Sequence, residues 1–201
     1  QLEEQTKDRA FFDGLTKLPN RYLLEDRLKI AINHSKRNLS YCALMFMDLD
    51  SFKGLNDQHG HVLGDVVLRE AASRLLGCVR DVDTVARFGG DEFVVVLNQL
   101  HNDLDYSIET ARRIAEKMRV ALALPYMLNQ SAGEDAPKMK RANRKERYPS
   151  EEGEIVYQGG TSIGVVIFLG DATEQLDLFA QADKAMYQAK KTGKNRVVAA
   201  P

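Results

Sequence analysis

Two short apolar segments, 84–88 and 93–97, are separated only by Gly89-Gly90-Asp91-Glu92. Short runs rich in valine and phenylalanine predict strands, and a brief connection containing glycine predicts that they pair as an antiparallel hairpin. Glycine adopts positive φ without strain and lets a bulky ligand approach the backbone. The hairpin therefore presents two adjacent carboxylates, Asp91 and Glu92, at a tight turn that suits ligand binding. An ordinary surface turn explains the same residues, since turns favour Asp and Gly.

The other apolar patterns predict a series of helices and strands. Residues 41–47 form a continuous apolar run that Asp48 ends, as in a strand buried on both faces. Helices are predicted at 21–36, 63–79, 103–123 and 173–191, and two further strands at 161–168 and 196–199. In the helix at 103–123, one buried stripe is expected to contain Ile108, Ala111, Ala115, Met118 and Leu122.

Two segments lack apolar periodicity. Residues 1–12 are polar and helix-prone, and we expect them to be the end of a helical linker from an upstream region absent from this chain. Residues 125–155 contain prolines, glycines and a basic run, and they are expected to form a long loop. For the basic run, a solvated charged surface and a contact with an acidic partner both stay open.

Composition excludes several classes of protein. The 201 residues are 44% hydrophobic, enough for a substantial core, and 28 basic against 29 acidic residues leave a formal net charge of −1. Nucleic acid is therefore not an expected partner, because duplex binding usually requires a basic excess. Cys42 and Cys78 have no CxxC motif or histidine neighbour and predict buried thiols in a reducing compartment. Because no apolar stretch approaches the ~18 residues of a membrane span and the charged N-terminus is not a signal peptide, we expect a cytoplasmic location.

A second acidic motif, Asp48-Leu49-Asp50, directly follows the apolar run 41–47. Carboxylates at the end of a central strand, next to acids on a neighbouring turn, form the oxygen-rich site that Mg²⁺ requires when it also binds phosphates. For the motif alone, a strand-ending turn is the alternative. Together with the hairpin tip, the motif predicts a metal site with carboxylates from two elements.

The segment after this motif carries Lys53, Asn56, His61 and Asp65. An amide and a carboxylate can read a guanine edge, because the amide addresses ring acceptors and the carboxylate accepts from N1–H and the 2-amino group. Taken singly, Asn56 also suits a turn. Asp65 also suits the first turn of a helix, where the helix dipole favours an acid.

Taken together, these motifs resemble one family. Residues 89–93 read Gly-Gly-Asp-Glu-Phe, the signature of the GGDEF domain family, the diguanylate cyclases. Residues 48–65, DLDSFKGLNDQHGHVLGD, are similar to a second family motif nearly position by position. Residues 13–21, 161–165 and 182–197 resemble three further motifs in the expected order.

The resemblance implies an α+β fold with a central, mainly antiparallel five-stranded sheet flanked by helices, similar to the palm of polymerases and class III nucleotidyl cyclases. It implies a bacterial catalytic domain at 13–201, in which 125–155 is an atypical insertion. The implied reaction joins two GTP into cyclic di-GMP and releases two pyrophosphates in a homodimer. Membrane association is expected only through an upstream region.

The resemblance also implies a metal and catalytic set. Asp48, the carbonyl of Leu49 and Asp91 resemble ligands of Mg²⁺, with Mn²⁺ as the alternative ion. Asp91, or Glu92 beside it, would help to remove the proton from the ribose 3′-hydroxyl. Lys53 resembles the residue that neutralises phosphate charge in the transition state. Phosphoryl transfer depends mostly on positioning and charge neutralisation, which agrees with this set.

A substrate-binding set is implied in the same way. Asn56 and Asp65 resemble the guanine readers, with His61 nearby in the motif, and Lys190 and Lys194 resemble the basic pair that holds the triphosphate. The two lysines are also explained as cations that interact favourably with the C-terminal end of a helix dipole.

One further motif, Arg80-x-x-Asp83, has the spacing of the family's inhibitory R-x-x-D site for cyclic di-GMP. An arginine can stack on guanine or bind its edge, and the aspartate can accept from that edge. A charged helix end is the alternative. Two other functions stay open: a catalytically silent domain that senses cyclic di-GMP, and a cyclase for a different purine product. The acids retained at the hairpin favour the enzyme, and Asp65 favours guanine.

Overall fold

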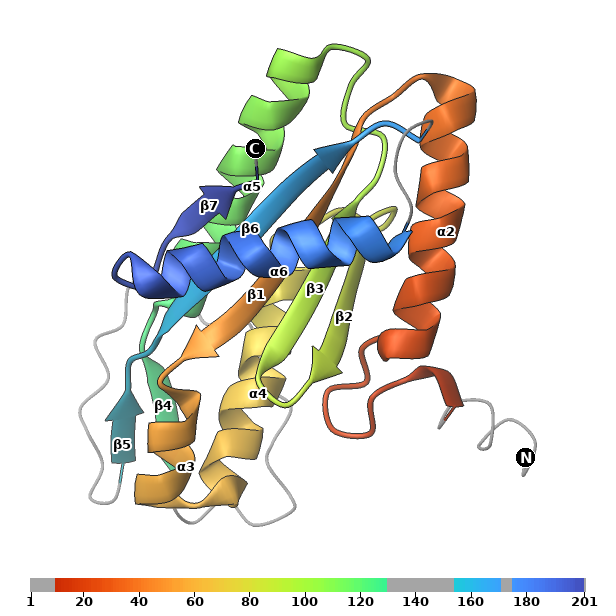
Figure 1. The fold of residues 1–201 in the computed structure, drawn as a ribbon. Helices are drawn as coiled ribbons and strands as arrows, with labels where there is room; N and C mark the ends of the chain where they lie inside the picture. The colour runs from red at the N-terminus through yellow and green to blue at the C-terminus, as the bar shows by residue number, and fades with distance from the viewer. Residues whose placement is uncertain (1–9, 130–153, 171–174, 201) are drawn as a thin grey trace.

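A five-stranded sheet forms the centre of the molecule, which the computed structural model describes for residues 10–129, 154–170 and 175–200. Its strands are β1 (Cys42–Asp50), β2 (Thr84–Gly89), β3 (Glu92–Leu97), β6 (Gly160–Phe168) and β7 (Val197–Ala199). The strand order is β2-β3-β1-β6-β7 (Figure 1), with β1 antiparallel to both of its neighbours, β2 antiparallel to β3, and β6 parallel to β7. The predicted α+β fold with a mainly antiparallel five-stranded sheet is confirmed.

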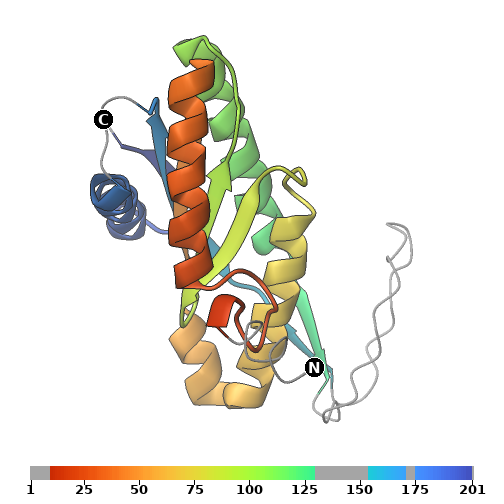
Figure 2. The same ribbon diagram turned by 90° about the vertical axis from the view of Figure 1, so that its right-hand side faces the viewer.

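Helices cover both faces of this sheet (Figure 2). One face packs against α2 (Arg21–Asn38) and α6 (Gln175–Lys191), and the other packs against α4 (His61–Leu76) and α5 (Leu104–Leu122). Successive side chains of β1 point to opposite faces, so Leu44 and Phe46 join the cluster under α2 and α6, whereas Met45 and Met47 join the cluster under α4 and α5. None of the helices described is long and apolar enough to cross a membrane.

Gly164 in β6 lets α6 approach the sheet closely. A side chain at this position would collide with the carbonyl oxygen of Ala182 and the amide nitrogen of Met186, both in α6. Interiors are close-packed, so even one added methyl group would displace the helix. Gly164 therefore sets the height of α6 above the strands.

β1 ends later in the chain than predicted, so that prediction was wrong. The strand does not stop before Asp48 but continues through Asp50, because β6 pairs with its whole length, including Asp48 with Ser162 and Asp50 with Gly160. A short helix, α3 (Phe52–His59), then follows and was not predicted. Only Phe52 and Leu55 are buried in α3, too few to produce a visible helical period.

The prediction of one long loop at 125–155 was wrong at both ends. Tyr126–Asn129 (β4) and Glu154–Tyr157 (β5) pair as a separate two-stranded antiparallel sheet. Tyr126 and Leu128 are buried and Met127 is exposed, which is strand alternation in a segment too short to recognise. Residues 1–9 of the predicted linker and the basic run within 130–153 lie outside the described residues.

Two smaller expectations about helices also need correction. Ile108 was expected in the buried stripe of α5 but is 41% exposed, while the other four members of that stripe are buried. The helix predicted at 63–79 instead begins at His61, directly after Gly60, and ends at Leu76. Gly60 has φ +83°, which glycine adopts without strain, so the chain turns sharply between α3 and α4.

Candidate nucleotide and metal site

The end of β1 and the tip of the β2–β3 hairpin lie side by side. Asp48 is paired with Glu92 across β1 and β3, so their side chains project from the same face of the sheet. The amide of Leu49 donates a hydrogen bond to the carbonyl oxygen of Asp91 (3.3 Å). The structure therefore brings together three of the predicted acids, Asp48, Asp91 and Glu92.

The hairpin turn is tighter than predicted, since Glu92 already belongs to β3 and only Gly90 and Asp91 connect the strands. Gly90 has φ +50°, in the left-handed region. No atom lies within 4 Å of where a Cβ would stand on Gly89 or Gly90. The backbone of the tip is therefore open to a ligand.

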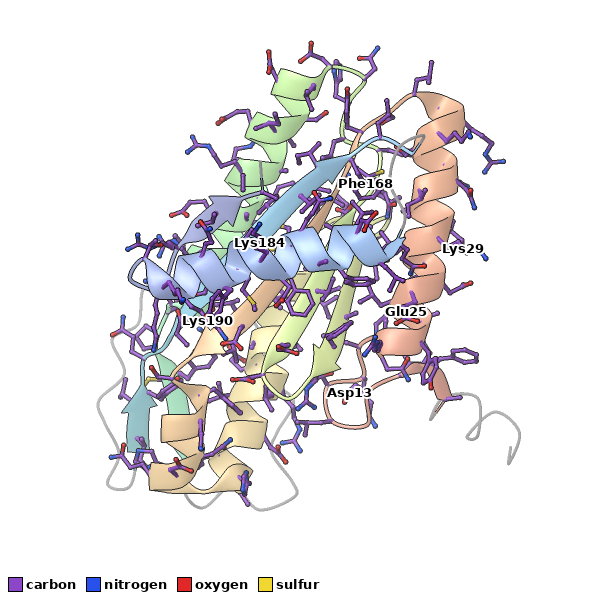
Figure 3. All side chains as sticks on the ribbon, in the orientation of Figure 1. Asp13, Glu25, Lys29, Phe168, Lys184 and Lys190 are labelled. Carbon is purple, nitrogen blue, oxygen red and sulfur yellow. The ribbon has the colours of Figure 1, made fainter. Side chains whose placement is uncertain are left out.

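Lys190 joins this acidic group from α6. Its Nζ lies 2.6 Å from Oδ2 of Asp48, in an ion pair whose side chains are 31% and 12% exposed, respectively. Lys190 lies near the C-terminal end of α6 in Figure 3, where the helix crosses the sheet. A helix packed against the face on which the Asp48 side chain lies thus delivers a cation to the acids.

Burial and mutual repulsion both act on these acids. Burial raises the pKa of Asp48, the hydrogen bond from Lys190 opposes this, and the negative charge of Asp91 raises the pKa further. The pKa of Glu92 is raised by burial and then by the charges of Asp48 and Asp91. Such a cluster favours a cation, and its carboxylate oxygens suit a hard one such as Mg²⁺. Within the part of the chain that the structure describes, no three His, Cys, Asp or Glu side chains are grouped to hold a metal by themselves.

Asp50, the second acid of the Asp48-Leu49-Asp50 motif, has a structural role. Its Oδ1 accepts from the hydroxyl of Ser162 and its Oδ2 accepts from the backbone amide of Asn195, both at 2.8 Å. Asp50 therefore fastens the loop after α6 to the end of β1. Gly193, Lys194 and Asn195 in that loop all have positive φ. Sequence reasoning missed this role, because nothing near Asp50 in the chain points to Asn195.

The predicted guanine readers lie at the corner between α3 and α4. Asn56 contacts Gly64, where any side chain would collide with its Oδ1. That oxygen is buried and has no hydrogen-bond partner, a costly state for a polar atom. Asp65, the residue after Gly64, is half-buried. An amide with an unused acceptor beside a carboxylate suits a polar ring edge.

Three other predicted residues are exposed. Lys53 lies in the first turn of α3, His61 is the first residue of α4, and Lys194 lies in the loop after α6. The structure gives none of these three side chains an ion pair among the described residues. The two lysines are therefore free to bind an anion.

Arg80 and Asp83 lie at the opposite end of β2 from the hairpin tip, before its first residue. Asp83 is almost fully enclosed: its carboxylate accepts from the amide of Arg80 (3.0 Å), the guanidinium of Arg80 (3.2 Å) and the amide of Asn98 (3.0 Å). In this ion pair the side chain of Arg80 is 55% exposed and that of Asp83 only 1%. Arg80 is therefore the member of the pair that faces solvent.

One contact at the hairpin was not foreseen. Arg87 of β2 donates to the carbonyl oxygen of Gly90 (2.7 and 3.0 Å) and to both carboxylate oxygens of Asp13 (3.1 and 3.2 Å). Asp13, labelled in Figure 3, also accepts from the amide and hydroxyl of Thr16. Arg87 thus connects the segment before α2 to the backbone of the hairpin tip.

A sheet of this order, with acids at the meeting of its central strand and a hairpin, is typical of the palm of nucleotidyl cyclases. A family model described as "Diguanylate cyclase, GGDEF domain" matches residues 10–124 and 119–196. The chain belongs to this family. The domain boundaries predicted from the sequence stay a prediction.

Two curated relatives illustrate the similarity. The chain is 39% identical to the bifunctional diguanylate cyclase/cyclic di-GMP phosphodiesterase MucR of Pseudomonas aeruginosa, over 92% of the chain and 23% of MucR. It is 33% identical to the diguanylate cyclase DgcP of the same organism, over 98% of the chain and 25% of DgcP. The chain thus spans about a quarter of these two relatives.

Solved structures agree with the fold. The GGDEF domain of TpbB (YfiN) from Pseudomonas aeruginosa superposes with a TM-score of 0.75 at 32% identity, covering 92% of this chain and 98% of that one. The coiled coil and GGDEF domain of DgcB from Caulobacter crescentus, solved in complex with c-di-GMP, gives a TM-score of 0.77 at 28% identity and covers 99% and 90% of the two chains.

The Asp13–Arg87 pair predicts a pH-dependent stability. Burial raises the pKa of Asp13, but hydrogen bonds from Thr16 and Arg87 and the charge of Arg87 lower it by more, so that the pKa lies below the ordinary 3.8. The pKa of Asp13 is lower in the folded protein than in the unfolded chain. The ionised carboxylate therefore stabilises the fold fully at a pH above the pKa of the unfolded chain, and this stabilisation is lost as the pH falls through the pKa of the folded protein. We expect Asp13→Asn to lower the free energy of unfolding at neutral pH by roughly 0.5–1 kcal/mol, measured by urea denaturation.

The difference between wild type and Asp13→Asn should shrink as the pH falls below the ordinary carboxyl value. Asp26→Asn, in an exposed position of α2, is the matched control and should change stability little at any pH. A difference for Asp13→Asn that stays constant from neutral to acidic pH would show that the charge of Asp13 does not matter.

Proposed function

We propose that this domain is a diguanylate cyclase that condenses two GTP into cyclic di-GMP and two pyrophosphates. The observation that carries the proposal is the meeting of Asp48, Asp91 and Glu92 with Lys190 at the end of the central strand. Acids that bind a cation, next to a lysine that binds phosphate, are what transfer of a nucleotidyl group requires. The relatives whose names describe them as diguanylate cyclases support this choice.

A divalent cation, Mg²⁺ or alternatively Mn²⁺, would be held by the carboxylates of Asp48 and Asp91 and by the carbonyl oxygen of Leu49. The oxygen donors suit such an ion, and the nucleotide's phosphates would supply further ligands. When bound, the ion neutralises negative charge on the reacting phosphates. Asp48 lies in β1 and Asp91 lies in the turn between β2 and β3, and the Leu49–Asp91 hydrogen bond holds this turn beside β1.

The other residues bind and orient GTP. Asn56 and Asp65 bind the guanine edge, with His61 nearby, and the unpartnered Oδ1 of Asn56 supports a polar ligand at this corner. Lys53, Lys190 and Lys194 bind the phosphates. These residues come from α3, α4, the end of α6 and the loop after it, and α3 contributes to both parts of GTP, with Asn56 at the base and Lys53 at the phosphates.

The reaction forms two phosphodiester bonds. In each half, the 3′-oxygen of one GTP attacks the α-phosphorus of the other, the bond to the β-phosphate oxygen breaks, and pyrophosphate leaves. The proton of the 3′-hydroxyl passes to the carboxylate of Asp91 or of Glu92. One domain with one GTP cannot present both hydroxyls to both phosphates, so we propose that two copies face each other across a two-fold axis.

The first test identifies the product. Incubation of the chain with GTP and Mg²⁺ should yield cyclic di-GMP, identified by mass. Asp48→Asn and Asp91→Asn should each lower the rate at least ~100-fold, because each removes a negative charge that holds the cation, and that cation neutralises the reacting phosphates. Asp105→Asn, an exposed acid at the start of α5, is the control and should retain the wild-type rate. Synthesis by Asp91→Asn at the wild-type rate would remove the catalytic assignment.

The second test concerns assembly. If two copies must meet, the rate per molecule should rise with enzyme concentration until the dimer is saturated. The rate is measured over a wide concentration range, together with the mass of the particle by light scattering. A constant rate per molecule across the monomer–dimer transition would contradict the two-copy mechanism.

The R-x-x-D pair is proposed as a product-inhibition site. Arg80 exposes its guanidinium, whereas Asp83 is enclosed and holds Arg80 in place. The role suggested for Asp83 from the sequence, accepting from the guanine edge, would require the carboxylate to leave its present donors. Since the pair lies at the opposite end of β2 from Gly90, a bound product would not displace GTP directly.

Arg80→Ala should therefore relieve inhibition by cyclic di-GMP and leave the initial rate close to that of wild type. Inhibition curves are measured for wild type, Arg80→Ala and Lys184→Ala, an exposed lysine of α6 (Figure 3) that serves as the charge control. Equal inhibition of all three proteins would show that Arg80-x-x-Asp83 is only a charged helix end and has no part in inhibition by the product. Binding of cyclic di-GMP without any synthesis would favour the sensing module over the cyclase.

A further inference from the structure

The ion pair between Lys190 and Asp48 links two residues that the proposed reaction uses for different partners. Lys190 Nζ is 2.6 Å from Asp48 Oδ2, within the range of a strong charge-assisted hydrogen bond. Under the proposed function, Asp48 binds a divalent cation and Lys190 binds phosphate. Lys190 therefore supplies to Asp48 the positive charge that the cation would bring. Asp48 supplies to Lys190 the negative charge that the phosphate would bring.

The surroundings make Lys190 the balancing charge of the site. The charged groups acting on Asp48 include Lys190, which is positive, and Asp91 and Asp50, which are negative. Lys190 is also the cation that acts on Glu92, alongside three acids. Asp50 is held by Ser162 and Asn195 and stays in place. Asp48 is thus the acid of β1 whose partner can change.

A lysine is suited to such a change. The ammonium is a compact charge on a four-carbon stem, so it can reach a new acceptor while the helix stays in place. Lys190 lies in the last turn of α6 and its side chain is 31% exposed. A divalent cation bound to Asp48 would repel an ammonium in contact with the same carboxylate. Metal and Lys190 therefore compete for Asp48.

We infer that Lys190 is an exchangeable internal counter-ion: it neutralises Asp48 until a metal–nucleotide complex binds, and then transfers to the phosphates as the metal takes the carboxylate. This inference rests on the proposed function. Its consequence is that metal and nucleotide bind cooperatively. The nucleotide gives Lys190 a new anion, and the metal gives Asp48 a new cation, so each ligand strengthens the other.

The experiment measures Mn²⁺ binding without turnover, from the electron paramagnetic resonance signal of the free ion, at a pH well above the carboxyl range. Lys190→Met removes the competing charge and should bind Mn²⁺ alone about tenfold more tightly than wild type, the ratio that corresponds to about 1.4 kcal/mol. Lys191→Met is the matched control. It makes the same change of charge one residue further along α6, where the ammonium lies 4.7 Å from the centre of the Tyr187 ring, and should leave the affinity unchanged.

The second half uses a GTP analogue with a methylene group between the α- and β-phosphates, which cannot be turned over. Lys190→Met should bind the Mn²⁺ complex of this analogue more weakly than wild type, the reverse of its effect on Mn²⁺ alone. Lys190→Gln repeats both measurements with a polar side chain, and circular dichroism verifies that each variant is folded.

The result that supports exchange is a crossover, in which Lys190→Met binds Mn²⁺ alone more tightly than wild type but binds the Mn²⁺–analogue complex more weakly. Equal affinity of wild type and Lys190→Met for Mn²⁺ alone, or weaker binding by the variant in both measurements, would overturn it. Synthesis of cyclic di-GMP by the wild type is assayed in parallel. Synthesis without the crossover would contradict only the exchange of Lys190. The crossover without synthesis would support exchange at a metal–nucleotide site and contradict the proposed cyclase activity.

Discussion

The structure depends on the burial of acidic side chains at the end of a central strand. Every residue of β1 is buried, including Asp48 and Asp50, and the strand is hydrogen-bonded to β3 on one side and β6 on the other. A charge in such a place is costly unless it is paired and hydrogen-bonded. The elements around β1 supply that pairing, and this requirement explains much of their arrangement.

Each carboxylate fixes a different neighbour. Asp50 binds Ser162 of β6 and the loop after α6, and Asp48 binds Lys190 of α6 itself. The helix can reach this position because Gly164 leaves room for its backbone. The position of α6 is therefore set jointly by packing on the apolar face and by the pairing of charges at the strand end. Neither interaction alone would orient Lys190.

Sequence patterns predicted those parts of the molecule that are encoded locally. The hairpin, the strand at 41–47 and most of the long helices produce a period or a turn signal within a few residues. The proximity of the Asp48-Leu49-Asp50 motif to the hairpin tip was predicted from these two acidic motifs. The short elements α3, β4 and β5 contain too few buried residues for a period to appear.

Contacts between distant parts of the chain were beyond such patterns. The structural role of Asp50 could not be predicted, because its partner Asn195 is brought to it only by the fold. The Asp13–Arg87–Gly90 connection was missed for the same reason. The roles of the site residues in binding and catalysis stay predictions.

The small β4–β5 sheet has a consequence for how the chain tolerates changes of length. Its antiparallel register places Asn129 opposite Glu154, so the two ends of the intervening segment are held next to each other. The entropy of closing a loop whose ends are already fixed grows only with the logarithm of its length, by about 0.6 kcal/mol for each doubling. Insertions and deletions between these two residues would therefore be absorbed there, and the register of the five-stranded sheet would not shift. Tags or whole domains could be grafted at this position with little effect on the carboxylates of β1.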